Sequence, residues 1–392
     1  MKVLHVYRTF FPESQGGLEE TIRQICLSTR ESGVESRVFT LSDEVEEGPV
    51  FVEGIEVHRV KRHLDLASCS ISFSFRQKFR RQYEWADIIH YHFPWPFGDL
   101  LHFMQLKPKP SIVTYHSDIV RQKVLKFFYA PVMNRFLDSI DRIVCTSPNY
   151  FATSETLVRF QDKVEVVPIG LDPDTYPQTN AESVQRVAEE YGEDFFMFIG
   201  VLRYYKGLHI LLDAVKGAPF QVVVAGSGPT EKALKAQAEK EGLTNVLFTG
   251  SVSDEEKVAM LQACRGIVFP SYLRTEAFGV TLLEGAMFGK PLISTEVGSG
   301  TSHVNIHDTT GYVVAPGSAK SLRKAMDRLW YSKDVATQLG KGARQRFNKL
   351  FTGSVMGARY AEIYRDMLPP KVEVALDAEA TSDEVRVKVV SR

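Results

Sequence analysis

The chain has 392 residues, of which 44% are hydrophobic and 24% are charged, and its formal net charge is -1 at pH 7. This length predicts two domains, and this composition is typical of a globular protein rather than a disordered one. The nearly neutral charge provides no positive field that would attract nucleic acid. The four cysteines lack metal-binding spacing, so we expect free thiols.

The start of the chain and its apolar runs bear on where the protein works. Residues 1–7 predict a short strand and not a signal peptide, because they lack a long apolar region and a small-residue cleavage site. No window has the ~18 consecutive apolar residues that a membrane span needs. We therefore expect a cytoplasmic protein, or one held peripherally on the inner face of the cytoplasmic membrane.

Short apolar runs alternate with helical patterns along the whole chain. The strands expected in the first half are 3–7, 36–40, 55–60, 87–91, 111–115, 141–145 and 163–167. Those expected in the second half are 195–200, 221–225, 245–248, 266–269, 291–294 and 311–314. The helical stretches between them include 18–32, 206–215, 230–241 and 280–288. Because most strands lack polar alternation, the pattern predicts α/β domains with doubly wound parallel sheets.

The rhythm breaks once, in a stretch rich in proline at 168–179, which we interpret as a linker. The predicted division is a first lobe at 1–170, a linker at 171–180, a second lobe at 181–350, a final helix at 351–368 and a tail at 369–392. Two Rossmann-like lobes would then face each other across a cleft, with ligands beyond the carboxyl ends of the strands. The tail is charged, and both a disordered segment and a late strand fit its pattern.

Two cations follow the first strand of the second lobe. Arg203 and Lys206 lie just after that strand, and a helix is expected to begin at about Lys206. Arginine can grip two phosphate oxygens, and a helix N-terminus adds positive potential. The segment therefore predicts a diphosphate site, with a solvated loop carrying ordinary charges as the alternative.

Two glutamates follow the fourth strand of the second lobe. Glu276 precedes an expected helix, and Glu284 lies within it. At the start of that helix, Phe278, Gly279 and Val280 would present unpaired backbone N–H groups to an anion. Taken singly, each glutamate would more simply be a surface charge.

Together these segments resemble a known family. Two glutamates separated by seven residues, downstream of Arg-x-x-Lys-Gly, are similar to the family 4 retaining glycosyltransferases of the GT-B fold. The resemblance covers nearly the whole chain. Further matching segments are Gly16-Gly17-Leu18-Glu19, Thr114-Tyr115-His116-Ser117-Asp118, Ala225-Gly226-Ser227-Gly228-Pro229 and Gly250-Ser251-Val252-Ser253.

The resemblance implies a first lobe that receives the acceptor and a second lobe that binds the nucleotide sugar. Arg203 and Lys206 would bind the diphosphate. Glu276 would face the donor sugar, Glu284 would hold the ribose, and His116 would contact the sugar at the reacting centre. The other donor-binding residues that it implies are Gly16, Gly17, Gly226, Gly228, Val252, Phe278, Gly279 and Val280.

Within the family, the chain is most similar to bacterial lipopolysaccharide O-antigen mannosyltransferases. The segments that carry this are Tyr91-His92-Phe93-Pro94, Tyr115-His116-Ser117-Asp118-Ile119-Val120 and Thr146-Ser147-Pro148-Asn149-Tyr150. The implied reaction moves mannose from GDP-mannose to a growing lipid-linked glycan. A GDP-D-rhamnose or UDP-sugar transferase of the same family is the alternative. From another class, a sugar-nucleotide epimerase and a non-catalytic nucleotide-sugar binder stay open.

The charge chemistry fits a retaining reaction without a metal or cofactor. Cleavage of the sugar–phosphate bond leaves extra negative charge on the diphosphate, which preorganised cations stabilise. Since no convincing carboxylate nucleophile is apparent, we favour attack from the face of the leaving group, with its phosphate as the base. Asp172-Pro173-Asp174 has the form of a metal-binding Asp-x-Asp motif but falls in the expected linker, so we expect no metal.

Other features of the first lobe suggest contacts beyond the donor. His92 and Trp95 belong to an aromatic loop that would either stack on an acceptor sugar or pack against the lobe. Two basic and aromatic stretches, at 75–83 and 121–135, would either hold an anionic membrane or be solvated helix faces.

Overall fold

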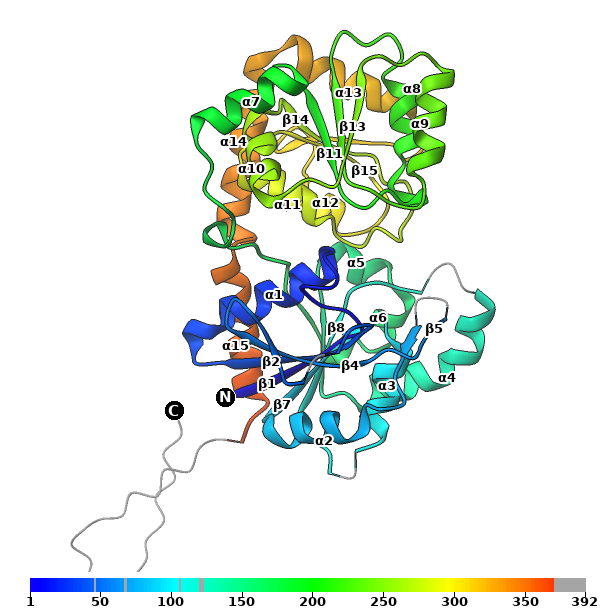
Figure 1. Cartoon of the computed structure of the whole chain (residues 1–392), viewed down its shortest axis with the longest axis vertical. Helices are drawn as coiled ribbons and strands as arrows, with labels where there is room; N and C mark the ends of the chain where they lie inside the picture. The colour runs from blue at the N-terminus through cyan, green and yellow to red at the C-terminus, as the bar shows by residue number, and fades with distance from the viewer. Residues whose placement is uncertain (46, 67–68, 106, 120–122, 370–392) are drawn as a thin grey trace, which may run out of the picture.

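The computed structural model describes residues 1–45, 47–66, 69–105, 107–119 and 123–369, and from residue 370 onward the expected tail lies outside this part. Figure 1 shows two α/β lobes, one above the other, with helices α14 and α15 running along one side of both. The predicted fold class is confirmed, with each lobe built on its own sheet.

The first lobe surrounds an eight-stranded sheet in the order β10-β9-β8-β7-β1-β2-β4-β3, and only the β3–β4 pair is antiparallel. Its strands are β1 (Lys2–Val6), β2 (Glu35–Ser42), β3 (Val50–Val52), β4 (Ile55–Lys61), β7 (Ile88–Phe93), β8 (Ser111–Tyr115), β9 (Arg142–Cys145) and β10 (Val164–Val166). A separate antiparallel hairpin joins β5 (Leu64–Leu66) to β6 (Cys69–Ile71). The helices are α1 (Gly17–Thr29), η1 (Arg30–Ser32), α2 (Arg76–Trp85), α3 (Pro96–Phe103), α4 (Lys123–Ser139), α5 (Pro148–Thr153), α6 (Glu155–Arg159) and η2 (Gln161–Lys163).

The second lobe has a six-stranded parallel sheet in the order β13-β12-β11-β14-β15-β16. Its strands are β11 (Phe196–Ile199), β12 (Val222–Ala225), β13 (Val246–Gly250), β14 (Gly266–Phe269), β15 (Leu292–Thr295) and β16 (Gly311–Val314). Its helical segments are α7 (Ala181–Tyr191), η4 (Tyr204–Lys206), α8 (Leu208–Ala214), α9 (Glu231–Lys240), α10 (Asp254–Ala263), α11 (Val280–Met287), α12 (Thr301–Val304), α13 (Ala319–Tyr331) and α14 (Lys333–Leu350). The turn η3 (Pro173–Thr175) precedes them in the linker, and α15 (Gly353–Asp366) follows them.

The order of the strands fixes where a ligand can bind. In the first lobe the chain winds outward in opposite directions from β1 and β7, and in the second lobe it does so from β11 and β14. Such a switch point opens a crevice at the carboxyl ends of the strands, because the adjacent crossover connections lie on opposite faces of the sheet. The two cations predicted to bind a diphosphate follow β11, and the two glutamates follow β14.

Helix α15 leaves the second lobe and packs across the sheet of the first. Its buried Met356, Tyr360, Ile363 and Tyr364 form one apolar cluster with strand residues of the first lobe such as Val3. In Figure 1 the red helix lies beside β1 and α1. The apolar spacing within 351–368 thus belongs to a helix whose buried face covers the first lobe.

Candidate active site

A cleft of about 1480 Å³ lies between the two lobes. Loops after β1, β8, β11 and β14 and the first turns of α1 and α11 form its walls. The predicted residues that line it are Gly16, Gly17, His116, Arg203, Lys206, Glu276, Phe278, Gly279, Val280 and Glu284. These residues come from both lobes, so the site is complete only when the lobes face each other.

Lys206 and Glu276 form an ion pair on the wall of the second lobe. The Lys206 Nζ lies 2.5 Å from Glu276 Oε2, and the Ser271 hydroxyl donates to the same oxygen at 3.1 Å. The turn that carries Lys206 ends at Gly207, whose φ is +71° and whose missing side chain leaves room for the Pro270 carbonyl. A Cβ at this position would lie 2.1 Å from that oxygen, so glycine brings the two loops together. The expected helix start at Lys206 is instead the 3-10 turn η4, and α8 begins at Leu208.

Arg203 is exposed at the cleft, in the same loop. No hydrogen bond or ion pair engages its guanidinium within the described residues, so it can receive an anion. The loop after β12 holds the backbone just before it, since Leu202 donates its N–H to the Ser227 carbonyl at 2.9 Å and Thr230 donates its hydroxyl to the Leu202 carbonyl at 2.8 Å. The lobe therefore presents one unpaired cation on a supported loop, beside the paired Lys206.

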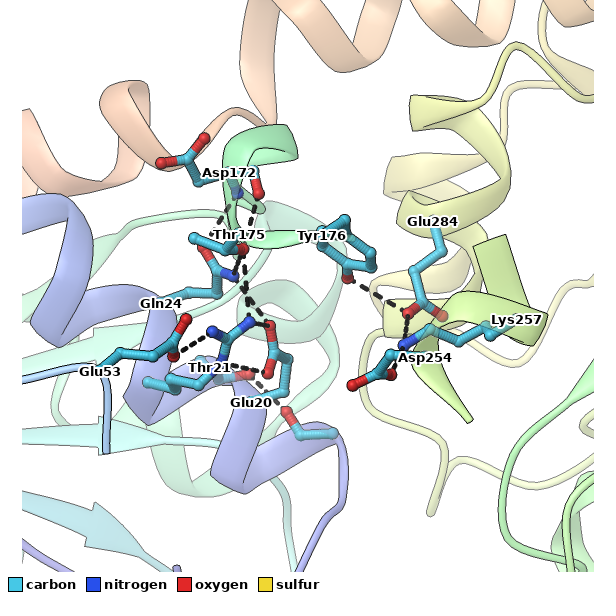
Figure 2. A network of polar contacts seen from close by, with 12 residues as sticks. Glu20, Thr21, Gln24, Glu53, Asp172, Thr175, Tyr176, Asp254, Lys257 and Glu284 are labelled. Atoms are coloured by element: carbon cyan, nitrogen blue, oxygen red, sulfur yellow. Dashed lines mark hydrogen bonds and ion pairs between the residues drawn. The ribbon is translucent and has the colours of Figure 1, made fainter. Parts of the chain in front are cut away.

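Glu284 is buried on α11 and is held by two residues that the sequence did not suggest (Figure 2). Its Oε1 accepts a hydrogen bond from the Tyr176 hydroxyl at 3.2 Å and lies 3.2 Å from the Lys257 Nζ. Burial opposes the charge of Lys257, but the carboxylates of Glu284 and Asp254 raise its pKa above the ordinary lysine value. These contacts leave Oε2 of Glu284 for a ligand hydroxyl.

The linker is tied to α1 beside this glutamate, as Figure 2 shows. The Gln24 side chain donates to the Thr175 hydroxyl at 2.8 Å and accepts from the Asp172 N–H at 2.9 Å. The Asp172 carboxylate itself accepts from the Asp174 N–H at 3.0 Å. The formal Asp-x-Asp segment thus closes the turn η3, and its first carboxylate acts as a cap.

On the opposite wall, the N-terminus of α1 faces that of α11. A Cβ built on Gly17 would lie 3.4 Å from a methyl group of Val280, so a larger residue would press on the other lobe. The neighbouring Glu19 accepts hydrogen bonds from the hydroxyls of Thr9 and Ser14 at 2.8 Å each, contacts that the sequence did not suggest. Both helix N-termini add positive potential to the cleft between them.

His116 follows β8 and lines the same cleft, 8% exposed. Its Nε2 lies 3.0 Å from Nδ1 of His92, which leaves Nδ1 for a ligand. Burial lowers the pKa of His116 to about 3, so the ring is neutral at physiological pH.

The proposed acceptor contacts of His92 and Trp95 are corrected by their burial. Trp95 is 1% exposed and donates its indole N–H to the Ser70 carbonyl at 2.9 Å, so its face packs in the core and cannot stack on a sugar. His92 is 2% exposed and lies behind His116. The aromatic loop follows the packing alternative, because its rings complete the apolar core of the lobe.

Three predicted donor-binding residues, Gly226, Gly228 and Val252, lie outside the cleft lining. A Cβ on Gly226 would lie 2.2 Å from the Gly200 carbonyl oxygen, and one on Gly228 would lie 2.6 Å from that of Leu202. Val252 packs against the apolar core of its lobe. The two glycines therefore support the loop that carries Arg203. Contact of these three residues with the donor stays a prediction.

An arginine that no sequence motif indicated joins the lobes. Arg274, in the loop after β14, lies 3.1 Å from the Asp118 carboxylate of the first lobe and donates to the Gly298 carbonyl at 2.9 Å. Its guanidinium also stands 4.5 Å from the centre of the Tyr150 ring. Asp118 lies two residues after His116, and Arg274 lies two residues before Glu276. The ion pair therefore joins the loops that carry these two residues.

Among the described residues, no helix is both long and apolar enough to cross a bilayer.

Two family models match the chain, one in each lobe. Residues 15–175 match the model described as Glycosyltransferase Family 4, and residues 180–346 match the model described as Glycosyl transferases group 1. The D-rhamnosyltransferase WbpZ of Pseudomonas aeruginosa is 50% identical over 90% of this chain and 92% of its own length. The O-antigen chain mannosyltransferase C of Escherichia coli is 44% identical over 95% of this chain and 100% of its own length.

Solved structures share the two-lobed architecture at low sequence identity. Sucrose-phosphate synthase from Thermosynechococcus elongatus superposes with a TM-score of 0.76 at 20% identity, covering 93% of this chain and 98% of that one. Anabaena HepE in complex with UDP-glucose superposes with a TM-score of 0.75 at 18% identity, covering 93% of this chain and 100% of that one. At these identities the likeness concerns the fold, which is the GT-B arrangement predicted from the sequence.

Proposed function

The chain belongs to the family 4 glycosyltransferases, and from this premise we propose that it transfers mannose from GDP-mannose to a lipid-linked glycan of lipopolysaccharide O-antigen, with retention of configuration. The observation that carries the proposal is the convergence of Arg203, Lys206 and Glu276 at the switch point of the second sheet. The sugar follows the name of the Escherichia coli relative.

The proposed roles follow from the charges. The donor diphosphate binds Arg203, draws Lys206 partly away from Glu276, and rests near the first N–H groups of α11. Glu276, relieved of part of its pairing, accepts a hydroxyl of the donor sugar. Glu284 accepts a ribose hydroxyl through Oε2. The cations stabilise the charge that grows on the leaving diphosphate, and such preorganised charge does not need to reorganise during the reaction.

Retention is proposed to proceed by attack on the face from which the diphosphate leaves. Among the described residues, each carboxylate lining the cleft already has a hydrogen-bond or ion-pair partner; these are Glu19, Glu20, Glu53, Asp65, Asp254, Glu276 and Glu284. Because these contacts give each carboxylate a partner within the protein, we favour the leaving phosphate as the base for the acceptor hydroxyl. A trapped covalent glycosyl-enzyme would contradict this route.

We further propose that the reaction needs no metal ion. Arg203, Lys206 and two helix N-termini already supply positive charge at the cleft. Full transfer activity in excess EDTA is the expected result, and loss of activity that Mg²⁺ or Mn²⁺ restores would overturn it.

D-rhamnose is the second candidate sugar, favoured by the 50% identity to a D-rhamnosyltransferase. The test compares GDP-mannose, GDP-D-rhamnose and UDP-glucose in thermal-shift and transfer assays, because a bound donor raises the midpoint of unfolding. Arg203→Ala should abolish the shift and the transfer. Product formation from donor alone would indicate an epimerase, and binding without transfer to any lipid-linked acceptor would indicate a nucleotide-sugar binder.

Contact with a membrane surface is proposed for α4. Its Phe127 and Phe128 are 76% and 74% exposed, whereas Phe79 and Tyr83 of the other basic stretch are buried in the core. Adjacent exposed phenylalanines near basic residues suit the interface of an anionic bilayer. Replacing both with serine should weaken cosedimentation with phosphatidylglycerol vesicles, whereas Phe51→Ser, at a site 66% exposed on β3, should not. Equal binding by all three proteins would exclude α4.

A further inference from the structure

Four buried histidines from three neighbouring strands lie together beneath the cleft. His5 on β1 is paired in register with His90 on β7, and His92 of β7 lies beside the end of β8, which His116 follows. The rings of His90 and His92 stack with centroids 4.4 Å apart, and those of His92 and His116 lie 5.3 Å apart. Of the four, only His116 has an expected role, the contact with the donor sugar, so the other three need a separate explanation.

Three of these rings form a single hydrogen-bonded chain that begins at the cleft. Nε2 of His116 lies 3.0 Å from Nδ1 of His92, and Nε2 of His92 lies 3.1 Å from Nδ1 of His5. The chain ends at Nε2 of His5, which is buried and has no hydrogen-bond partner among the described residues.

The unpartnered nitrogen of His5 decides in which direction the hydrogen bonds between the three rings are donated. A neutral imidazole carries one N–H and one lone pair, so each bond fixes the tautomer of the next ring. A buried N–H without an acceptor is rarer than an acceptor without a donor. The favoured arrangement therefore leaves the lone pair on Nε2 of His5 and places N–H groups on Nδ1 of all three rings.

We propose that His5 and His92 are positioning residues that hold His116 in its Nδ1–H tautomer, so that His116 presents a hydrogen-bond donor to the cleft. An N–H directed into this cleft would donate to an oxygen of the bound donor, and this last step rests on the proposed function. In the opposite tautomer, His116 would offer a lone pair, which could accept from a sugar hydroxyl but would repel a phosphate oxygen.

His90 does not belong to the chain, although it stacks on His92. Its Nδ1 lies 2.7 Å from the Tyr364 hydroxyl and its Nε2 lies 2.7 Å from the Thr114 hydroxyl. A metal ion held by His5, His90 and His92 would require nitrogens that these bonds already occupy. His90 therefore gives a matched control, since it is equally buried on the same strand but makes no hydrogen bond to His116.

The test combines two substitutions of His92 with the control. His92→Asn places an amide N–H near the position of Nδ1 and should keep the bond to His116. His92→Gln places its amide near the position of Nε2 and should lose that bond. The loss of one buried hydrogen bond corresponds to a fall in kcat/KM of about tenfold. We expect this fall in His92→Gln, with near-normal kcat/KM in His92→Asn and His90→Gln.

A measurement without substrate separates this inference from the proposed function. In protein labelled with 15N-histidine, NMR should show the His116 proton on Nδ1 in the wild type, in His92→Asn and in His90→Gln. In His92→Gln, the signal of a tautomer mixture is expected. A wild-type proton on Nε2 of His116 would overturn the proposal, as would a His92→Gln protein with an unchanged tautomer. Failure of transfer in an assay would leave this NMR result unaffected.

Discussion

At the residue scale, the Lys206–Glu276 pair is where the donor must compete with the protein for a cation. Because the pair is part of a partly buried unit with Ser271, removing one partner leaves the other charge unmatched. Lys206→Ala should therefore lower kcat/KM by roughly 100-fold or more, as expected for the loss of a group that stabilises developing charge.

A double-mutant cycle separates charge stabilisation from simple loss of structure. Lys206→Ala combined with Glu276→Ala should cost less than the sum of the single changes, since the two groups act as one unit. As a control, Lys235→Ala breaks an exposed pair with Glu231 on α9 and should leave kcat/KM unchanged. Strict additivity in the cycle would mean that the pair does not work as a unit.

The residues that could be predicted from the sequence lie at strand ends, whereas those that could not depend on tertiary packing. Arg203, Lys206 and Glu276 stand next to strand ends, and the parallel-sheet pattern places strand ends at the cleft. Lys257 was missed because it lies on a different helix, α10, and only the tertiary structure brings it to Glu284 on α11. Trp95 was placed wrongly, because an aromatic run after a strand does not reveal which of its rings fill the core.

At the element scale, strands with long apolar runs were predicted well and short ones were not. All thirteen expected strands are present with small shifts at their ends. The three strands that the sequence did not suggest, β3, β5 and β6, have three residues each and pair antiparallel. So short a segment carries too little periodicity to stand out, whereas a strand buried on both faces must be apolar throughout.

The loop after β12 shows how one element supports another. Gly226 has a φ of +129°, and its missing side chain admits the Gly200 carbonyl. We expect Gly226→Ala to push the 200–203 loop away, lower the free energy of unfolding by about 2 kcal/mol or more, and weaken donor binding. Urea unfolding and donor titration measure the two effects.

The matched control is Gly242→Ala. Gly242 also has a positive φ, of +63°, but nothing lies within 4 Å of its Cβ position. It should show only the backbone strain, of about 1 kcal/mol, with normal donor affinity. Equal losses in the two variants would mean that the close approach to Gly200 has no special role.

At the scale of the whole molecule, the buried histidines predict how stability changes with pH. Burial lowers the pKa of His5 and of His116 to about 3, and it also lowers the pKa of His90 and His92. Between about pH 6.5 and pH 3, the unfolded chain binds protons that the folded chain does not, so the free energy of unfolding falls as the pH falls. Each such histidine contributes a slope of about 1.4 kcal/mol per pH unit.

The contribution of Asp99 to the free energy of unfolding changes with pH in the opposite direction. Burial raises its pKa to about 8, so its contribution is full below its unfolded pKa and is lost as the pH rises through about 8. Urea unfolding at several pH values should therefore show a steep loss of stability below about pH 6.5. In His116→Asn, the slope of the free energy of unfolding against pH should be smaller by about 1.4 kcal/mol per pH unit, which corresponds to one proton. An unchanged slope would mean that His116 is protonated in the folded state.

The ion pair of Arg274 with Asp118 is one of the contacts that join the two lobes. The Arg274 guanidinium joins the loop of Glu276 to the loop of His116, through Asp118. Asp118 is in turn held by the Tyr115 and Ser154 hydroxyls at 2.8 Å each, so the contact reaches into the core of the first lobe. Since ligands of the second lobe alone do not need this contact, its loss should affect transfer more than nucleotide binding.

Arg274→Met keeps the length of the side chain and removes the charge. Without the ion pair the two lobes should face each other for less of the time, so we expect a larger radius of gyration in small-angle X-ray scattering and a fall in kcat/KM of about tenfold. The affinity for GDP should be unchanged. Arg346→Met is the control, since within the described part of the chain Arg346 donates only to the His303 carbonyl of the second lobe. If Arg274→Met matched the wild type in both scattering and turnover, the facing of the two lobes would have to come from the linker and from the packing of α15 on the first sheet.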